Sequence, residues 1–476
     1  MTLPKHRTPQ GALACLALCV TLASLGTSIA NVALPELARF FSVSVQGAQW
    51  IVLAYLLPLT VLVVNAGKIG DLLGRRKVLL FGLALFVFAS LLCGFTPWYW
   101  ALLLSRGAQG IGAAVLMALT LAVIRDIVPR EKMGGAMGLI GTMSAIGTAL
   151  GPSLGGFLVS VWGWRSLFFV LSPLGLLVLV LAYFYLPKDH EREKSSPAFD
   201  GLGTLFLAFT LLCYSLAMTV NRTAFGTENI AMLLLGVLAL GLFIRIENKA
   251  SFPLLKPELF ADKQFVFNLL SNTVVASVMM STLVVGPFYL SISLGLDEKD
   301  IGLVMASGPV MASISGVPAG MAVNRWGVKH TMLAGLGLML LGSLSIIYFP
   351  DLFGPTGYVM ALALLTPGYQ MFQAANNTAV MMDTHTDQRG LIAAMLTLFR
   401  NVGLITGASV MGGIFAFSAG SAPLESLGPE AVSMGMGITF IVASSLVFIC
   451  LLVAVFGIDQ AIGTEALRTN KIKSNA

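Results

Sequence analysis

Charged side chains are scarce in this sequence. Of its 476 residues only 11% are Asp, Glu, Lys or Arg, while 57% are hydrophobic. Soluble domains carry roughly a quarter charged residues, so this chain has too few to cover a surface that faces water. Long apolar runs recur along its length instead, which is typical of transmembrane helices, whereas a transmembrane β-barrel would show short alternating segments. The sequence therefore predicts an all-α polytopic membrane protein.

Residues suited to metal or redox chemistry are also few. None of the four His lies within an apolar run, and all five Cys lie inside such runs without the spacing of a metal site or a disulfide framework. The chain has no Walker-type phosphate loop and no cluster of His, Cys or carboxylates at membrane depth. We therefore expect no cofactor and no metal site, and these absences argue against an enzyme and against a primary pump.

Fourteen membrane-spanning helices are predicted from the apolar runs. Most of them exceed the roughly 20 residues that a helix needs to cross a bilayer, so tilt or kinks are expected. The predicted helices cover residues 11–34, 48–67, 78–95, 98–124, 133–161, 166–186, 201–220, 229–246, 266–294, 301–323, 331–349, 357–382, 391–418 and 431–456.

The Lys and Arg residues are distributed unevenly between the two sides of these helices. With the N-terminus inside, 22 of the 28 lie at or beyond cytoplasmic helix ends, four lie in outer loops, and Arg106 and Arg400 lie within helices. Such a bias sets the orientation of a membrane protein. The sequence thus predicts a multi-pass protein of the cell (inner) membrane with both termini in the cytoplasm. Its net charge of +6 is expected to meet anionic lipid headgroups and not nucleic acid.

Two cytoplasmic loops resemble each other across the chain. "GKIGDLLGRRKVLLFGLAL" from Gly67 aligns with "GMAVNRWGVKHTMLAGLGL" from Gly320, so that Gly74 corresponds to Gly327. Two halves of like orientation are a feature of parallel-repeat transporters. We therefore expect an N-terminal six-helix bundle over residues 1–186 and a C-terminal six-helix bundle with a tail over 264–476. A central two-helix insertion with its linkers is expected over 187–263.

Several segments resemble the major facilitator superfamily. "GKIGDLLGRRK" is similar to its loop signature, "LLLSRGAQGIGAA" to its Arg-x-x-Gln-Gly-x-Gly element, and "GTALGPSLGG" to the Gly-Pro element of its antiporters. "IANVALP" and "WRSLFFVLSPLG" resemble its fourteen-helix drug:proton antiporter branch. The resemblance covers nearly the whole chain, and it implies a functional role for each of these segments. For the loop it implies a conformational switch made by Gly67, Asp71, Gly74, Arg75 and Arg76.

The resemblance also implies roles for polar and small residues inside the helices. It places Asn31, Arg106, Gln109 and Arg400 on the proton and substrate path, and it assigns an antiporter-type seal to Gly147, Gly151, Pro152 and Gly155. Each group has a structural alternative. An Arg within a span costs ~2.5–3.5 kcal/mol on insertion scales, so the two Arg residues are either functional or interior hydrogen-bonding struts. The glycines spaced by four line one helix face, and that face is either a seal or a close helix contact.

One acid of the antiporter branch is missing. The resemblance implies an Asp nine residues before Pro35, and this chain has Gly26 there. Arg cannot give up a proton in a protein, so Arg106 cannot replace the acid. Proton coupling then depends on acids near helix ends, or it is weak or absent. The remaining candidates are Glu36, Asp71, Asp126 and Asp383.

Uncharged polar and aromatic residues are candidates for a substrate cavity near the bilayer midplane. They are Trp50, Tyr55, Asn272, Tyr289, Gln370, Gln373 and Asn377. Each amide has hydrogen bonding between helices as its alternative role. We expect a secondary transporter that binds small molecules and protons and exports drugs or other amphipathic organic compounds by proton antiport through alternating access. A metabolite exporter or a weakly coupled facilitator is the alternative, because Gly26 replaces the acid.

Overall fold

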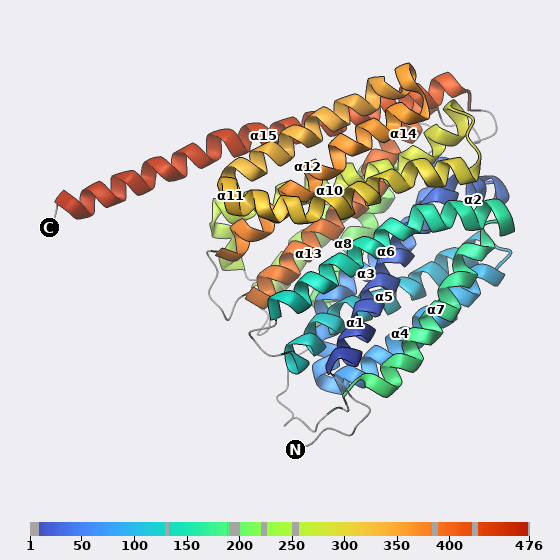
Figure 1. Ribbon diagram of the computed structural model, residues 1–476, viewed down its shortest axis with the longest axis horizontal. Helices are drawn as coiled ribbons and strands as arrows, with labels where there is room; N and C mark the ends of the chain where they lie inside the picture. Colours follow the sequence, from blue (N-terminus) through green and yellow to red (C-terminus); the bar gives the residue numbers. More distant parts are fainter. Residues whose placement is uncertain are drawn as a thin grey trace.

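The computed structural model is a bundle of long helices (Figure 1). It describes residues 9–128, 133–187, 189, 200–219, 226–249, 257–382, 389–420 and 427–474. The candidate proton acceptor Asp383 and most of the two linkers that flank the expected insertion lie outside these residues. The α-helices are α1 (Pro9–Ser28), α2 (Leu34–Phe40), α3 (Val45–Leu73), α4 (Arg75–Phe95), α5 (Tyr99–Ile127), α6 (Met133–Trp162), α7 (Arg165–Tyr185), α8 (Gly201–Thr219), α9 (Thr227–Glu247), α10 (Lys263–Phe288), α11 (Glu298–Phe353), α12 (Pro355–Met382), α13 (Arg389–Thr406), α14 (Gly412–Ala419) and α15 (Pro429–Ser474). Short 3-10 or π-helical turns are η1 (Asn31–Ala33), η3 (Pro257–Ala261), η4 (Tyr289–Ser293) and η5 (Gly407–Met411).

Within these described ranges, twelve helices are long and apolar enough to cross a membrane. The prediction of fourteen spans is therefore not confirmed. The predicted and observed numbers of spans differ because of two helices, α11 and α12. The 56-residue α11 is one helix among the twelve, although two predicted helices fall on it, and α12, which carries four amide side chains, is not among them. Long apolar faces explain why the other predicted ranges coincide with helices.

The helices form two groups that lie side by side (Figure 1). In the N-terminal group, α1 and α3 to α7 pack against one another, with α5 in contact with α1, α3 and α4. In the C-terminal group, α11 packs along α12 and α15, and α10 packs on α13. The last helix, α15, extends beyond the rest of the molecule towards the C-terminus (Figure 1).

Two glycines break the chain at corresponding places in the two groups. Gly74 separates α3 from α4 with φ 98° and ψ 123°, and Gly327 interrupts α11 with φ 79° and ψ 169°. A positive φ strains residues that carry a Cβ, so glycine is required at both turns. These are the two glycines that the sequence repeat aligns, and they share this uncommon backbone conformation.

The two groups touch closely at one end of the molecule, which we call the closed end. The Arg39 guanidinium donates to Ser291 Oγ across the groups at 2.9 Å. Gly156 of α6 and Gly302 of α11 pack backbone against backbone, and a Cβ added to Gly156 would lie 2.5 Å from Gly302 Cα. The Gln49 side chain packs against the backbone of Gly412. The closed end is therefore held by small residues and few polar contacts.

Helices α8 and α9 pack against each other, and α8 contacts both groups. Trp50 Nε1 and Asn65 Nδ2 of α3 donate to Thr219 and Thr204 of α8, and Tyr214 of α8 donates to Thr406 of α13. Most of α9 is exposed. The α8 helix thus fills one side of the junction between the groups, while α9 covers it from outside.

Candidate functional site

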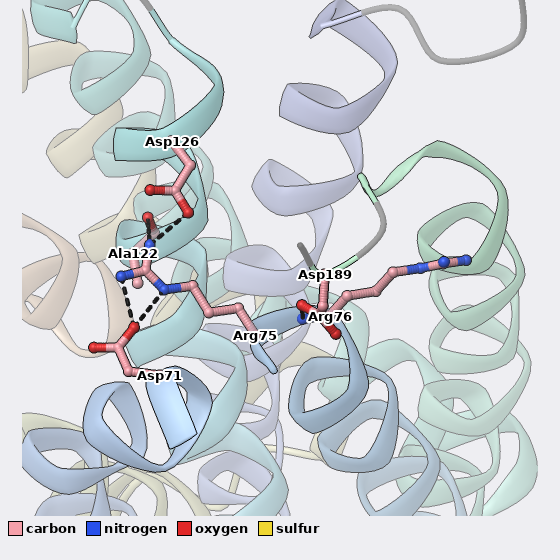
Figure 2. Close-up of polar contacts among 6 residues, drawn as sticks. All are labelled: Asp71, Arg75, Arg76, Ala122, Asp126 and Asp189. Atoms are coloured by element: carbon pink, nitrogen blue, oxygen red, sulfur yellow. Dashed lines mark hydrogen bonds and ion pairs between the residues drawn. The ribbon is translucent and has the colours of Figure 1, made fainter. Parts of the chain in front are cut away.

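The loop between α3 and α4 is organised around Arg75 (Figure 2). Its guanidinium forms an ion pair with Asp71 of α3 at 2.7 Å and another with Asp126 of α5 at 2.7 Å. It also donates to the Ala122 carbonyl oxygen of α5 at 2.7 Å. One side chain therefore ties the ends of α3 and α5 to the first turn of α4. The sequence predicted Asp71 and Arg75 as parts of a switch, and the structure brings them into direct contact.

A third carboxylate, that of Asp189, meets the same loop and was not predicted from the sequence. It follows α7 and lies beside Arg76 (Figure 2). Its carboxylate accepts hydrogen bonds from the backbone N–H groups of Arg76 at 2.9 Å and Lys77 at 3.3 Å. A Cβ on Gly74 would lie 2.5 Å from its Oδ2. A carboxylate at a helix N-terminus satisfies free N–H groups and complements the helix dipole. Because its partner is distant in sequence, no local capping pattern marks Asp189.

Arg76 anchors the loop on its other side. Its guanidinium donates to the Tyr183 carbonyl oxygen of α7 and lies 5.4 Å from the centre of the Tyr183 ring. Together with Asp189, it fixes the first turn of α4 to the end of α7. At Gly67, no described residue would lie within 4 Å of an added Cβ, so the space beside this glycine is open to the part of the chain that the structure describes.

We expect Asp189→Asn to weaken the attachment of α4 to the segment after α7. The neutral amide keeps one acceptor oxygen but loses the charge, and a negative charge at a helix N-terminus contributes about 0.3–1 kcal/mol. The measurable result is faster proteolytic cleavage of the membrane-embedded protein after α7, together with a lower thermal midpoint. Cleavage at the wild-type rate would contradict the role of this carboxylate.

Arg106 is completely buried within the N-terminal group. Its Nε donates to the Ile51 carbonyl of α3, and its guanidinium also donates to the Gly26 carbonyl of α1 and to Gln109 Oε1. The Tyr55 ring lies 4.4 Å from Cζ. The structure thus brings Arg106 and Gln109 together with α1, and every acceptor that it describes for this cation is neutral.

Gly26 occupies the position at which an acid was expected. A Cβ there would lie 3.0 Å from Tyr55 Oη and 3.1 Å from the Phe86 ring. The site therefore has little space for a side chain, and the backbone carbonyl of Gly26 accepts from Arg106 instead. Asn31 lies five residues further on, in η1; it is fully buried, and its side-chain amide has no hydrogen-bond partner among the described residues.

The predicted glycine face of α6 packs on α1. A Cβ on Gly147 would lie 2.4 Å from the Thr21 carbonyl, and one on Gly151 would lie 2.0 Å from Ser28 Oγ. Gly155 faces Ile29 and Val32 in the same way. Pro152 lies inside α6, and its carbonyl oxygen lies close to Gly302 of the opposite group. The face makes a close helix contact within one group, and the adjacent face of α6, with Pro152 and Gly156, makes the contact between groups.

The predicted cavity residues divide between two levels of the molecule. Asn272 donates to the Leu396 carbonyl and accepts from Gln373, which also donates to Tyr369. Tyr289 lies 17 residues after Asn272, so the two are about 25 Å apart along the helix axis. Tyr289 therefore cannot share one small-molecule site with Asn272.

The other predicted cavity residues have mixed environments. Trp50 donates to Thr219, the buried Tyr55 donates to the Ala23 carbonyl, and Gln370 donates to the Ala312 carbonyl. Asn377 is exposed, while Arg400 is half-buried and its Nε has no partner among the described residues. Among the described residues no group of three His, Cys, Asp or Glu could hold a metal ion.

Comparison with known proteins identifies the family. The sequence pattern of the Major Facilitator Superfamily matches residues 16–408. The chain belongs to the major facilitator superfamily. Members of this superfamily are typically transporters and not enzymes, and each similar protein named below is a transporter or a drug-resistance protein. The fourteen-helix drug:proton antiporter branch stays a prediction.

Three proteins with similar sequences align along most of the chain. The multidrug resistance protein Stp of Mycobacterium tuberculosis is 31% identical over 82% of this chain and 73% of its own length. The drug efflux pump JefA of the same organism is 31% identical over 89% of this chain and 84% of its own length. The riboflavin transporter RibZ of Clostridioides difficile is 26% identical over 92% and 95%.

A solved structure has the same fold. It is that of a bacterial homologue of the human lysosomal transporter Spinster, in an inward-facing and occupied conformation, and it superposes with a TM-score of 0.68. The alignment covers 93% of this chain and 95% of the other, with 15% sequence identity. This likeness establishes the arrangement of the helices for this member of the superfamily.

Proposed function

We propose that this chain is a secondary active transporter that exports drugs or other amphipathic small organic molecules through alternating access. Membership of the superfamily and the 31% identity to two proteins named for drug resistance and drug efflux support the export function. The Arg75 network carries the mechanistic part of the proposal, because it joins three helix ends at the loop that separates two transmembrane segments.

The membrane topology that we propose has fourteen spans. The break at Gly327 divides the 56-residue α11 into two segments, each longer than the roughly 20 residues that cross a bilayer. With α12 as a further span, both termini lie in the cytoplasm, and the closed end faces the outside of the inner membrane. The three proposed domains remain residues 1–186, 187–263 and 264–476.

In this topology the Arg75 network and the closed end lie on opposite sides of the membrane. We infer that the two groups rock so that the contacts between Gly156 and Gly302 and between Arg39 and Ser291 separate when the outside opens. The ties from Arg75 and Asp189 keep the cytoplasmic ends of α3, α4, α5 and α7 together during that motion. Rigid groups with small contacts between them are what rocking requires.

Proton antiport is the proposed coupling, and weakly coupled transport is the second candidate. Gly26, with Tyr55 and Phe86 packed around it, favours the second because every described acceptor of Arg106 is neutral. Antiport would then use Glu36, Asp71, Asp126 or Asp383. A metabolite substrate is also consistent with the similarity to a protein named as a riboflavin transporter.

Everted membrane vesicles that contain the protein test this proposal. We expect saturable uptake of at least some members of a panel of neutral, cationic and anionic aromatic compounds, and faster uptake when the lumen is acidified. Substrate-evoked proton release from the lumen would establish antiport, whereas saturable uptake that ignores the pH gradient would establish the facilitator. Absence of uptake for the whole panel, in vesicles that hold folded protein, would refute the export function.

A further inference from the structure

The charged residues inside the membrane-spanning segments have one sign. In the candidate spans that the structure describes, every Asp and Glu lies four residues or fewer from a span end. The deepest of them is Glu36, four residues from Phe40. Arg106 lies seven residues inside its span and Arg400 lies eight residues inside its own. With α11 divided at Gly327, Arg325 and Lys329 lie at the ends of its two segments. The described interior then holds two permanent cations, Arg106 and Arg400, and no anion at a comparable depth.

Arg106 has only neutral neighbours to offset its charge. Its hydrogen bonds go to two backbone carbonyls and one amide, and its Nη2 has no partner among the described residues although it is buried. An ionised group taken out of water without a counter-charge is costly. Charged residues within membrane spans pair with one another or with backbone carbonyls, and they mark the paths of substrates and ions. A counter-anion is thus the chemical complement of this site.

The position of Arg106 allows its charge to act on the junction between the groups. It is hydrogen-bonded to Ile51 of α3, and α3 packs against α13, α14 and η5 of the opposite group. One helix, about 10 Å across, separates Arg106 from that group. At this distance, with an effective dielectric constant of about 20, a unit charge changes the occupancy of an oppositely charged ligand by about tenfold. A cation is disfavoured by the same factor.

Among the described residues, no Asp or Glu lies at the depth of Arg106 to act as its counter-ion. The closest position on α1 is Gly26, and Tyr55 and Phe86 leave little space there for a carboxylate side chain. Arg400, the second interior cation, comes from α13 of the opposite group, so both groups contribute positive charge.

We propose that the substrates of this transporter are amphipathic organic anions, bound in the positive field of Arg106 and Arg400. This proposal rests on the proposed transport function and narrows it. A lipophilic cation at the same site would be repelled from both groups. The field acts on any anionic headgroup, carboxylate or sulfonate, joined to an aromatic or aliphatic body.

Three compounds that share one aromatic ring system and differ in charge test the proposal. Proteoliposomes that contain the full chain are given 2-naphthalenesulfonate, 2-naphthalenesulfonamide or 2-naphthyltrimethylammonium, and initial rates are measured. We expect the sulfonate to be transported about tenfold faster than the sulfonamide, and the ammonium compound to be slowest. Because neither permanent charge titrates and the sulfonamide is uncharged in neutral and acidic media, the order is expected to hold in both.

Variants assign the preference to the interior cations. Arg106→Gln is expected to reduce the ratio of sulfonate to sulfonamide rates by about tenfold, and Arg106→Lys is expected to retain most of it. Arg245→Gln removes one exposed cation from α9 and is expected to leave the ratio unchanged. Arg400→Gln provides an independent test if Arg106→Gln does not fold.

Each other outcome overturns the proposal. Equal rates for the three compounds, a preference for the ammonium compound, or an unchanged ratio in folded Arg106→Gln and Arg400→Gln would exclude the anion field while leaving transport established. Failure of all three compounds to move, when other members of the vesicle panel do move, would exclude the substrate class alone. Failure of the whole panel would remove the transport function as well.

Discussion

Arg75→Gln is expected to lower the transport rate by about tenfold or more while the protein still folds and inserts. The substitution removes two ion pairs and a hydrogen bond to the Ala122 carbonyl, all at 2.7 Å. It also leaves the carboxylates of Asp71 and Asp126 facing each other without the cation that now lies between them. Their repulsion would push the end of α3 away from the end of α5, where the rocking group must stay rigid.

The loss of stability from Arg75→Gln is expected to be small. The two carboxylates are 40% and 38% exposed, and exposed ion pairs contribute about 0–1 kcal/mol each. Transport in proteoliposomes, measured beside the thermal midpoint of the same preparation, separates the two effects. Lys77→Gln is the matched control, since it removes a neighbouring exposed cation whose backbone alone is bonded to Asp189.

A second substitution tests whether repulsion between the two carboxylates causes the loss of transport in Arg75→Gln. Adding Asp126→Asn to Arg75→Gln leaves one carboxylate and is expected to recover a large part of the lost rate. A double variant that is as inactive as Arg75→Gln would show that the cation itself is needed. A fully active single variant would exclude the network from the transport cycle.

Much of the fold follows from apolar periodicity, because a helix in lipid must satisfy its own backbone groups. Each of the fourteen predicted ranges falls largely on helical residues. The repeat also identified Gly74 and Gly327, whose positive φ values explain why glycine stands at both turns. The number of spans did not follow in the same way, because the two segments on either side of Gly327 form one 56-residue element, α11, and the amides of α12 make that helix less apolar.

The site was less predictable, because its contacts join segments that are distant in sequence. Asp71 and Arg75 are four residues apart on the chain, so a short sequence motif was enough to predict that they act together. Asp189 meets the loop from 113 residues away, and no local pattern marks such a contact. The amides of Asn272 and Gln373 bond to each other between α10 and α12, which sequence alone left open as an alternative to a cavity.

The second large effect is expected at the closed end, where Gly156→Val should abolish most transport. A Cβ on Gly156 would lie 2.5 Å from Gly302 Cα, 2.8 Å from the Glu298 carbonyl oxygen and 3.0 Å from Gly302 N. These are backbone atoms, so no side chain can move aside. Carbon atoms rest about 3.5–4.0 Å apart, and α6 and α11 would have to separate by about 1 Å or more. The closed end then cannot close, and alternation stops with the outside open.

Gly141→Val on the same helix separates this wedge from a general effect of valine in α6. Nothing would lie within 4 Å of a Cβ on Gly141, so the control makes the same change of helix propensity without a contact between groups. A cysteine introduced for the buried Gln49, which packs on Gly412 at the closed end, reports the state of that end. Its labelling by an impermeant maleimide from outside is expected to rise in Gly156→Val and to stay low in Gly141→Val. Equal inactivity of the two valine variants would point to damage within α6, and normal transport by Gly156→Val would show that α6 and α11 need not meet during the cycle.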